Sequence, residues 1–464
     1  MIAAQRISGR VSRRALLSGG LAGGFLLAFH LPVYAVNEPV QPPDVTDGKF
    51  APNAFIRIDN AGKTTLVMPQ VEMGQGIYTA VAMVLAEELD ADFSSVVLEH
   101  APANEKLYAN PVFGIQATGG STSVRAFWKP LRQAGASARS MLVQAAAHQW
   151  RVDPASCTTA NGEVIHTASG RKLSYGALAL AANSETPPKD VALKDPKDFV
   201  LIGKPLKRVD TPDKANGKVI YGIDAMLPDM KFATLKACPV FGGKVGKVDD
   251  SAATKIPGVQ KIVVLDDMVA VVGDHMWAAQ KGLEALAIDW DEGPNARISS
   301  KDIWQDLRAA SEKDGVVAKS TGDIAKGLAA GERLDAAYEL PFLAHATMEP
   351  LNCTVHLKPD SCDIWTGTQI MARVQSEAAK AAGLPIEKVT VNNHFIGGGF
   401  GRRLEPDMVV AAVRVAKQVD GPVKVVWTRE EDVQQDIYRP VYRDTIAATL
   451  SDGKIVGWKY KVSG

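Results

Sequence analysis

The chain has 464 residues, with 52 basic and 52 acidic side chains and 46% hydrophobic residues. At roughly 100–200 residues per domain, this length predicts several domains, and the ordinary apolar fraction excludes a disordered or fibrous chain. Zero formal net charge argues against a nucleic-acid-binding protein, and four Cys without any C-x-x-C spacing argue against a zinc ribbon or an iron–sulfur cluster carried by this chain.

Residues 1–35 predict a signal for export. The segment SRRALL at 12–17 resembles a twin-arginine motif, and the apolar stretch 15–29 is short for a membrane span of about 20 residues. The sequence VYA at 33–35 fits a small-residue cleavage site. We therefore expect a periplasmic protein exported by the twin-arginine route, which carries folded proteins and often their cofactors. The alternative is a buried or surface helix at the N-terminus.

The first half of the chain predicts a linker followed by mixed strands and helices. The Pro-rich segment 36–53 is the linker, and a hairpin of strands at 54–58 and 64–68 follows it. A helix after Gly76 has one apolar face, formed by Ile77, Val81, Val84, Leu85 and Leu89. Next come a strand near 96–99 and a helical region from about 123 to 150, with Pro130 as a candidate kink.

A polar, Pro-rich segment at 183–216 predicts a domain boundary. Beyond it we expect a compact α/β domain that ends near 293, with strands at 218–223, 232–238, 259–265, 268–272 and 288–290 and a helix at 277–287. A polar stretch with an amphipathic helix near 301–311 follows. The last segment predicts strands at 352–357, 363–366, 389–395, 423–428, 444–450 and 459–463 and helices at 371–382 and 407–419.

Three glycine-rich loops each precede a helix: Gly74-Gln75-Gly76, the segment GGSTS at 119–123, and the segment GGGFG at 397–401. Glycine lets a backbone approach a ligand closely, and a helix N-terminus suits a phosphate. Each loop alone is more often an ordinary turn, and none fits a dinucleotide fingerprint or a P-loop. Neutral polar residues accompany the loops and suit a large, heteroatom-rich ligand such as a pterin: Gln75, Ser121, Thr122, Ser123 and Gln369.

Other candidate sites are weaker. His345, Glu349 and His356 are close enough in sequence to be metal ligands, but no fourth ligand is near, so a strand turn with satisfied polar groups is the simpler interpretation. His394 is expected to be structural. No G-x-S-x-G elbow occurs, which argues against a serine hydrolase.

Together, the segments VEMGQG at 71–76, GGSTS at 119–123 and GGGFGRR at 397–403 resemble the molybdenum hydroxylase, or xanthine oxidase, family. The resemblance covers residues 50–464. Within that family, the chain most resembles the molybdopterin-binding beta subunits of isoquinoline 1-oxidoreductase and related periplasmic aldehyde dehydrogenases. In those subunits the order of the segments is permuted, so that the MGQG loop comes first, as it does in this chain. The segment 208–292 resembles the family's α/β hammerhead domain.

The resemblance implies a mixed α/β fold in which a split, permuted molybdopterin-binding domain carries an inserted α/β hammerhead domain. The expected parts are the signal at 1–35, the first part of the cofactor domain at 36–200, the hammerhead domain at 205–293, and the second part at 330–464. The family's general-base glutamate lies in a G-x-G-E segment, which these 464 residues lack. We therefore assign no general base and expect the chain to be truncated at its C-terminus.

By resemblance, the cofactor is a molybdenum ion on molybdopterin cytosine dinucleotide, with no metal ligand from the protein. The implied cofactor-binding residues are Gly74, Gln75, Gly76, Ser121, Thr122, Ser123, Gly399, Phe400, Gly401 and Arg402. Gln369 matches a glutamine beside the metal, and Glu349 matches an acidic position on the substrate side. Relatives have an acidic residue one place earlier than Glu405, so Glu405 is given no role.

The resemblance implies an enzyme that hydroxylates an N-heterocycle or oxidises an aldehyde with oxygen from water. Its electrons would pass to a small two-iron–two-sulfur subunit and then to a cytochrome c. Two alternatives stay open. One is a truncated, non-catalytic exported protein that keeps the glycine loops as a binding scaffold, and the other is an unrelated nucleotide-binding protein.

Overall fold

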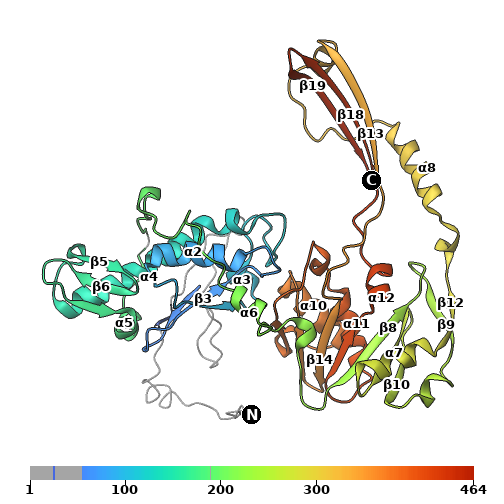
Figure 1. Cartoon of the computed structure of the whole chain (residues 1–464), viewed down its shortest axis with the longest axis horizontal. Helices are drawn as coiled ribbons and strands as arrows, with labels where there is room; N and C mark the ends of the chain where they lie inside the picture. The colour runs from blue at the N-terminus through green and yellow to red at the C-terminus, as the bar shows by residue number, and fades with distance from the viewer. Residues whose placement is uncertain (1–24, 27–54, 189) are drawn as a thin grey trace. The chain divides into compact units, whose positions relative to one another are not determined.

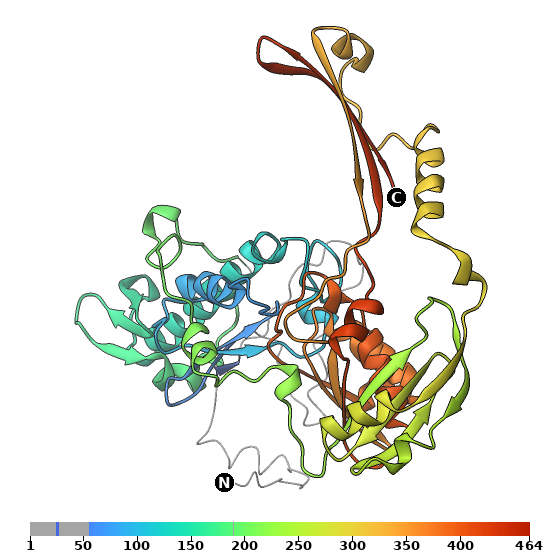
Figure 2. The same ribbon diagram turned by 45° about the vertical axis from the view of Figure 1, so that its right-hand side comes forward.

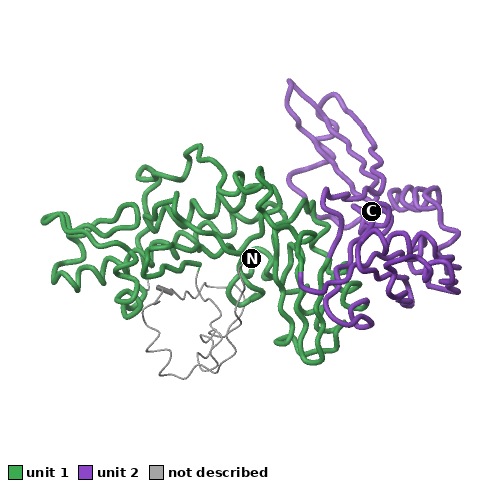
Figure 3. Tube along the Cα trace, turned by 60° about the horizontal axis from the view of Figure 1, so that its bottom comes forward, with its two compact units in different colours: residues 1–226, 353–414 green, residues 227–352, 415–464 purple. Residues whose placement is uncertain are grey.

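The computed structural model describes residues 25–26, 55–188 and 190–464 and divides into two compact units (Figure 3). The first unit comprises residues 1–226 and 353–414, and the second comprises 227–352 and 415–464. The predicted export signal and linker lie outside the described residues, apart from the two-residue strand β1 (Phe25–Leu26). Within the described ranges, no helix combines the length and apolar character that crossing a membrane requires.

The N-terminal part of the first unit is a small mixed sheet covered by two helices (Figure 1). Its elements are β2 (Ile56–Ile58), β3 (Thr64–Met68), α2 (Ile77–Leu89), β4 (Val97–His100), α3 (Glu105–Tyr108) and α4 (Ser123–Trp150). The sheet order is β1-β2-β3-β4; β2 and β3 form the predicted antiparallel hairpin, and β4 pairs parallel to β3 through the α2 crossover.

Helix α2 packs closely against α4. The five apolar residues predicted for its buried face are all within the hydrophobic core of this unit. Gly135 of α4 permits the close approach, because a Cβ at that position would lie 2.7 Å from the carbonyl oxygen of Leu85. Pro130 lies inside α4, as expected.

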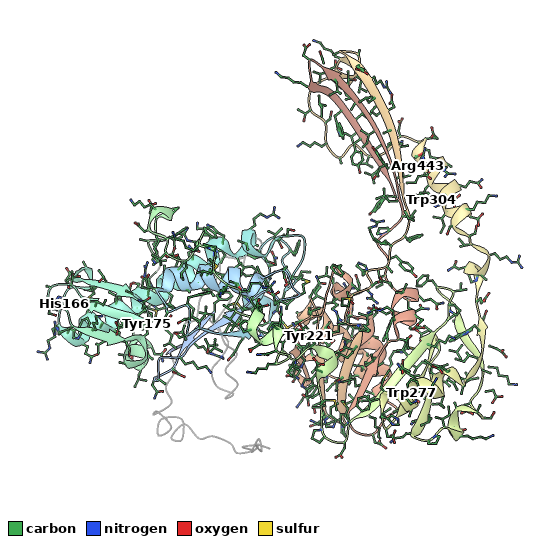
Figure 4. The ribbon with its side chains drawn as sticks, viewed as in Figure 1. His166, Tyr175, Tyr221, Trp277, Trp304 and Arg443 are labelled. Carbon is green, nitrogen blue, oxygen red and sulfur yellow. The ribbon has the colours of Figure 1, made fainter. Side chains whose placement is uncertain are left out.

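A three-stranded sheet extends this part of the unit. It contains β5 (Cys157–Ala160), β6 (Glu163–His166) and β7 (Lys172–Ser174), and α5 (Tyr175–Ala182) follows it. Figure 4 labels His166 at the end of β6 and Tyr175 at the start of α5. The buried Tyr175 hydroxyl donates to the Leu89 carbonyl oxygen at 2.6 Å, which fastens α5 to the end of α2.

The C-terminal part of the first unit supplies three further strands and two helices. They are β14 (Asn352–Lys358), β15 (Ser361–Thr366), α10 (Met371–Ala382), β16 (Val389–Asn393) and α11 (Asp407–Ala416). β14 and β15 are antiparallel, and β16 lies parallel to β15 after the α10 crossover. Gly383 ends α10 with a left-handed φ of 75°, as the sequence predicts.

The second unit contains the predicted α/β segment. Its elements are β8 (Lys231–Ala237), β9 (Lys244–Asp249), β10 (Val259–Val264), β11 (Met268–Gly273), α7 (Met276–Glu284), β12 (Ala287–Asp291), β17 (Val423–Val426) and α12 (Arg429–Gln434). The order β10-β11-β8-β17 forms one run of paired strands, and β12 pairs with β9. α7 packs on β8 and β11.

The rest of the second unit is an extended three-stranded antiparallel ribbon, clear in Figure 2. It is built from β13 (Glu332–Leu340), β18 (Tyr442–Ser451) and β19 (Lys454–Ser463), with α8 (Ser300–Ser311) and α9 (Ile324–Leu328) beside it. Ser299 begins α8 with a capping box to Asp302.

One predicted strand is wrong. Residues 218–223 form no strand, and a short 3-10 turn (Gly222–Asp224) lies at their end. The Lys218 amide donates to the Asn216 side chain at 3.1 Å, and the Tyr221 amide donates to the Asp224 side chain at 3.0 Å. These side chains therefore bind backbone amides that would otherwise pair with a neighbouring strand. The helix predicted at 407–419 also ends earlier, at Ala416.

Candidate functional site

The first unit brings the three glycine-rich loops together around Gln369. The Thr118 amide, just before the GGSTS segment, donates to the Gln369 carbonyl oxygen at 3.0 Å. From the other side, a Cβ added at Gly399 would lie 2.6 Å from Gln369 Oε1 and 2.6 Å from Met73 Sδ. The segments 71–76, 118–123 and 397–403 therefore meet at one place, as a shared ligand site requires.

Gln369 has a fixed side chain with one unused atom. Its side chain is buried, at 4% exposure, and its Nε2 donates to the Thr118 carbonyl oxygen at 2.8 Å. Its backbone amide donates to the Arg403 carbonyl oxygen at 2.9 Å. Its Oε1 has no hydrogen-bond partner among the described residues. A buried acceptor without a donor is costly, so this oxygen fits a ligand that brings a donor.

The start of α4 remains open to an anion. Ser121 has a left-handed φ of 52° and is exposed, and Thr122 precedes the helix without a side-chain cap. The Thr122 hydroxyl donates to the Gly119 carbonyl oxygen at 2.8 Å, and the Ser123 hydroxyl donates to Gln70 Oε1 at 2.8 Å. No acidic residue occupies the first turn of this 28-residue helix. Its N-terminal amides and its dipole therefore favour a phosphate there.

The start of α2 differs, because an internal carboxylate occupies it. Glu72 Oε1 accepts from the amides of Gly74 at 2.8 Å and Gly76 at 3.1 Å, and its Oε2 accepts from the Tyr78 amide at 3.1 Å. Gln75 is exposed, and its Nε2 donates to the Val71 carbonyl oxygen at 2.9 Å. Two amides of this loop therefore have an acceptor within the protein, and the cofactor-binding role of Gly74, Gln75 and Gly76 stays a prediction.

The third loop combines backbone strain with buried arginines. Phe400 has a left-handed φ of 53° and a side chain that is 73% exposed. Arg403 donates from Nε to the Gly398 carbonyl oxygen and from Nη1 to that of Gly367, both at 3.1 Å. The guanidinium of Arg402 is buried against the Asp407 carboxylate, at 2.6 and 2.8 Å. Both arginines thus hold the loop that presents Phe400.

Glu349 belongs to the second unit, whereas Gln369 belongs to the first. Glu349 is buried, at 7% exposure, and its Oε1 accepts from Asn352 Nδ2 at 2.9 Å. Arg429 donates to the carbonyl oxygen of Met348 at 3.0 Å and also to that of the residue before it. The substrate-side role of Glu349 stays a prediction.

One of the weaker metal candidates, His345, has a carboxylate partner in the protein. His345 Nδ1 lies 3.0 Å from both carboxylate oxygens of Asp436. Among the residues that the structure describes, no group of three or more His, Cys, Asp or Glu is arranged to hold a metal ion. The four Cys are unpaired thiols.

The sequence reasoning missed three residues that shape these loops: Glu72, Arg208 and Arg403. Glu72 is part of the VEMGQG segment and Arg403 is part of the GGGFGRR segment. The spacing of these segments does not reveal that the carboxylate and the guanidinium are buried. Arg208 is 136 positions from Glu72 in sequence, yet its Nη2 donates to Glu72 Oε1 at 3.0 Å. Only the folded chain reveals such a contact.

Two family models match the chain, and both are described as a molybdopterin cofactor-binding domain. One covers residues 33–223, and the other covers 309–464, so together they span more than half of the chain. The first contains the MGQG and GGSTS loops, and the second contains Gln369 and the loop around Phe400. The converging loops of the first unit therefore come from both matched regions.

Among known relatives, the chain is 32% identical over 98% of its length to the beta subunit of isoquinoline 1-oxidoreductase from Brevundimonas diminuta. It is 31% identical over 99% of its length to a membrane-bound aldehyde dehydrogenase (pyrroloquinoline-quinone) of Gluconacetobacter polyoxogenes, and 28% identical over 91% to a nicotinate dehydrogenase subunit of Pseudomonas putida. The chain spans 64%, 61% and 36% of the lengths of these relatives. On both comparisons, the chain belongs to the molybdopterin-binding proteins of the xanthine oxidase family.

Proposed function

We propose that this chain is the molybdopterin-binding subunit of an oxidoreductase that hydroxylates an N-heterocycle or oxidises an aldehyde. The observation that carries the proposal is the unpartnered Oε1 of Gln369, which is buried beside the bare backbone of Gly399. A large ligand with hydrogen-bond donors can approach there because Gly399 has no side chain. The open N-terminus of α4 lies on the same loop cluster and suits the anionic part of that ligand.

The residues present fit a molybdenum–molybdopterin cytosine dinucleotide. Ser121, Thr122, Ser123 and the first amides of α4 would hold its phosphates, and Gln369, Gly399, Phe400 and Gly401 would lie beside its reactive end. When bound, the cofactor would supply the two-electron redox chemistry that adds a water-derived oxygen to the substrate carbon. The protein's own part is orientation.

Orientation begins with the amide of Gln369. Its Nε2 is committed to the Thr118 carbonyl oxygen, so the amide cannot flip without losing a 2.8 Å hydrogen bond. Its Oε1 is therefore presented as an acceptor. Arg403 fixes the neighbouring backbone through two carbonyl oxygens, which keeps Gly399 against Gln369. We assign no general base.

The substrate class follows from relatives and from Phe400. The named relatives include an isoquinoline oxidoreductase, an aldehyde dehydrogenase and a nicotinate dehydrogenase. An exposed aromatic ring at a strained backbone position is suited to contact a flat or apolar substrate. We therefore propose that Phe400 is on the substrate side.

Partners and location belong to the same proposal. The four Cys lack the C-x-x-C spacing that is common among cluster ligands. We therefore propose that electrons pass from this chain to a small two-iron–two-sulfur subunit and then to a cytochrome c. The segment 12–17 would direct twin-arginine export to the periplasm. Replacing Arg13 and Arg14 together by lysine should leave the protein in the cytoplasm, whereas processing and export unchanged by that variant would exclude this route.

The test of the proposed function is cofactor retention by a Gln369 variant. Gln369→Met keeps the length of the side chain but removes both the donor to Thr118 and the free acceptor. Molybdenum and pterin per chain should fall at least tenfold. The matched control is Gln375→Met, because Gln375 is on the neighbouring helix α10 and donates to the Val389 carbonyl oxygen at 2.8 Å. Equal retention in both variants would contradict the site.

A further inference from the structure

A fully buried carboxylate lies where the α2 N-terminus would otherwise bind an external anion. Glu72 is 0% exposed, and its two oxygens accept from three alternate loop and helix amides, those of Gly74, Gly76 and Tyr78. Backbone amides that converge at a helix start form an anion-binding concavity. Here the anion is part of the chain.

Two cations neutralise this carboxylate. Arg208 Nη2 lies 3.0 Å from Glu72 Oε1, and Lys214 Nζ lies 3.5 Å from the same oxygen. Both cations also bind Asp210, at 2.7 and 2.5 Å. Arg208 Nη1 further donates to the Gly74 carbonyl oxygen at 2.9 Å. One guanidinium therefore holds both the carboxylate and the backbone of the glycine loop.

These cations come from a strap, defined here as residues 208–224. The Val209 amide donates to Thr79 Oγ1 at 3.1 Å, which lays the strap on the first turn of α2. Lys214 Nζ lies 5.3 Å from the centre of the Phe395 ring. Tyr221, labelled in Figure 4, forms an isolated parallel bridge with Phe395, which leads into the third glycine loop. The strap thus touches the first loop and the residue Phe395 that precedes the third loop.

Glu72 itself also connects these two loops. Its backbone carbonyl oxygen accepts from the Ile396 amide at 3.4 Å, while its side chain organises residues 74–78. A carboxylate with three amide donors and two cations is held by strong, charge-assisted hydrogen bonds. The loop is therefore shaped before any ligand arrives.

We propose that Glu72 and Arg208 are positioning residues that pre-form the MGQG loop and direct the anionic part of the cofactor to the start of α4. This inference rests on the proposed function for its ligand. A phosphate at the start of α2 would compete with the Glu72 carboxylate, which already accepts from the amides of Gly74, Gly76 and Tyr78. The start of α4 has neither an acidic first turn nor a side-chain cap.

The test compares Glu72→Gln with Glu87→Gln in the full chain, purified with its partner subunit. Glu87 is a matched control, because it is also a fully buried residue of the α2 region, is bound by Lys194 and accepts from the three amides of residues 200–202. Each glutamine keeps the shape but loses the charge. The first readout is amide hydrogen exchange in protein from cells deprived of molybdate, so it needs no cofactor.

We expect Glu72→Gln to speed exchange of the amides at 74–78 by roughly tenfold or more, since an amide that loses its charged acceptor loses most of its protection. Glu87→Gln should speed exchange only around 200–202. In protein grown with molybdate, Glu72→Gln should retain at least tenfold less pterin than the parent, and Glu87→Gln should match the parent. Unchanged exchange at 74–78, or equal pterin loss in both variants, would overturn the inference.

A milder variant keeps the inference testable if Glu72→Gln does not fold. Arg208→Lys keeps the positive charge, but one ammonium with three donors cannot reproduce the four hydrogen bonds that the Arg208 guanidinium makes to Glu72, Asp210 and the Gly74 carbonyl oxygen. It should speed exchange at 74–78 by several fold, and parent-like exchange would overturn the inference. A parent chain that binds no pterin would contradict the proposed function alone, because the exchange measurements would still report on the contacts of Glu72 and Arg208.

Discussion

A methyl group at Gly399 tests the packing at the centre of the site. The added Cβ would lie 2.6 Å from both Gln369 Oε1 and Met73 Sδ, about 1 Å closer than ordinary contact. The φ of Gly399 is outside the left-handed region, so alanine brings no backbone strain. The Met73 side chain is flexible and can move, but Gln369 moves only by losing its bond to Thr118.

The expected cost of Gly399→Ala combines two effects. Overpacking a filled site costs about 1–3 kcal/mol, and the strained or broken Gln369 hydrogen bond adds about 1 kcal/mol. We therefore expect the free energy of unfolding to fall by about 2–4 kcal/mol. Urea unfolding followed by circular dichroism measures this change in the cofactor-free protein, and pterin content measures its effect on binding, which should fall at least tenfold.

Two glycines provide controls. A Cβ at Gly119, in the same loop cluster, would meet only Leu404 Cδ1 at 3.6 Å, and a Cβ at Gly315 would meet nothing within 4 Å. Neither has a left-handed φ, so alanine should leave stability unchanged or raise it by up to about 1 kcal/mol. Gly315→Ala should also leave pterin content unchanged. If Gly399→Ala were as stable as Gly119→Ala and kept its pterin, the packing of Gly399 against Gln369 would be refuted.

Three further predictions concern charged residues. Burial raises the pKa of Glu431 to about 7, so its carboxyl stabilises the fold less as pH rises. In urea titrations, the stability of Glu431→Gln relative to the parent should therefore increase by up to about 3 kcal/mol between pH 5 and pH 8. A difference in stability that does not change with pH would contradict this prediction. Burial raises the pKa of Asp210, but hydrogen bonds from its two cationic neighbours outweigh that effect and lower it to about 2. The contribution of Asp210 to the free energy of unfolding should therefore be present above about pH 4 and disappear as the pH falls toward 2. Asp210→Asn should remove about 2 kcal/mol of this loss of stability in acid. If the variant lost as much stability in acid as the parent, the contacts of Asp210 with the strap cations would be contradicted. Arg403→Met leaves the carbonyl oxygens of Gly367 and Gly398 without their guanidinium donor. It should therefore lower the free energy of unfolding by about 2–4 kcal/mol. A loss below about 0.5 kcal/mol, which is typical of a surface substitution, would show that the arginine does not hold the loop.

Local sequence signals predicted many of the regular elements, but β5, β6, β7 and β9 were not predicted. The apolar spacing of α2 and the Gly383 stop of α10 follow from helix geometry, and both are confirmed. The strand β13 was missed although Leu334, Ala336 and Tyr338 alternate, because its flanks are polar and most of its side chains are exposed. Strands that pair outside a hydrophobic core leave a weak signal in the sequence.

The site was predicted in part. The glycine loops and Gln369 were identified as one group, and the fold brings them together. The charges that shape the loops were not, because Glu72 meets Arg208 only after the strap folds back across more than a hundred residues. The same strap explains the wrong strand at 218–223, where contacts with distant residues and local side-chain bonds replace sheet pairing.

The most direct test of the proposed function is the molybdenum and pterin content of this chain purified with the proposed iron–sulfur partner from cells supplied with molybdate. We expect one molybdenum and one pterin per chain, with cytidine monophosphate released on acid hydrolysis if the cofactor is the cytosine dinucleotide. A folded, assembled complex that contains neither molybdenum nor pterin in a stoichiometric amount would contradict the proposed function.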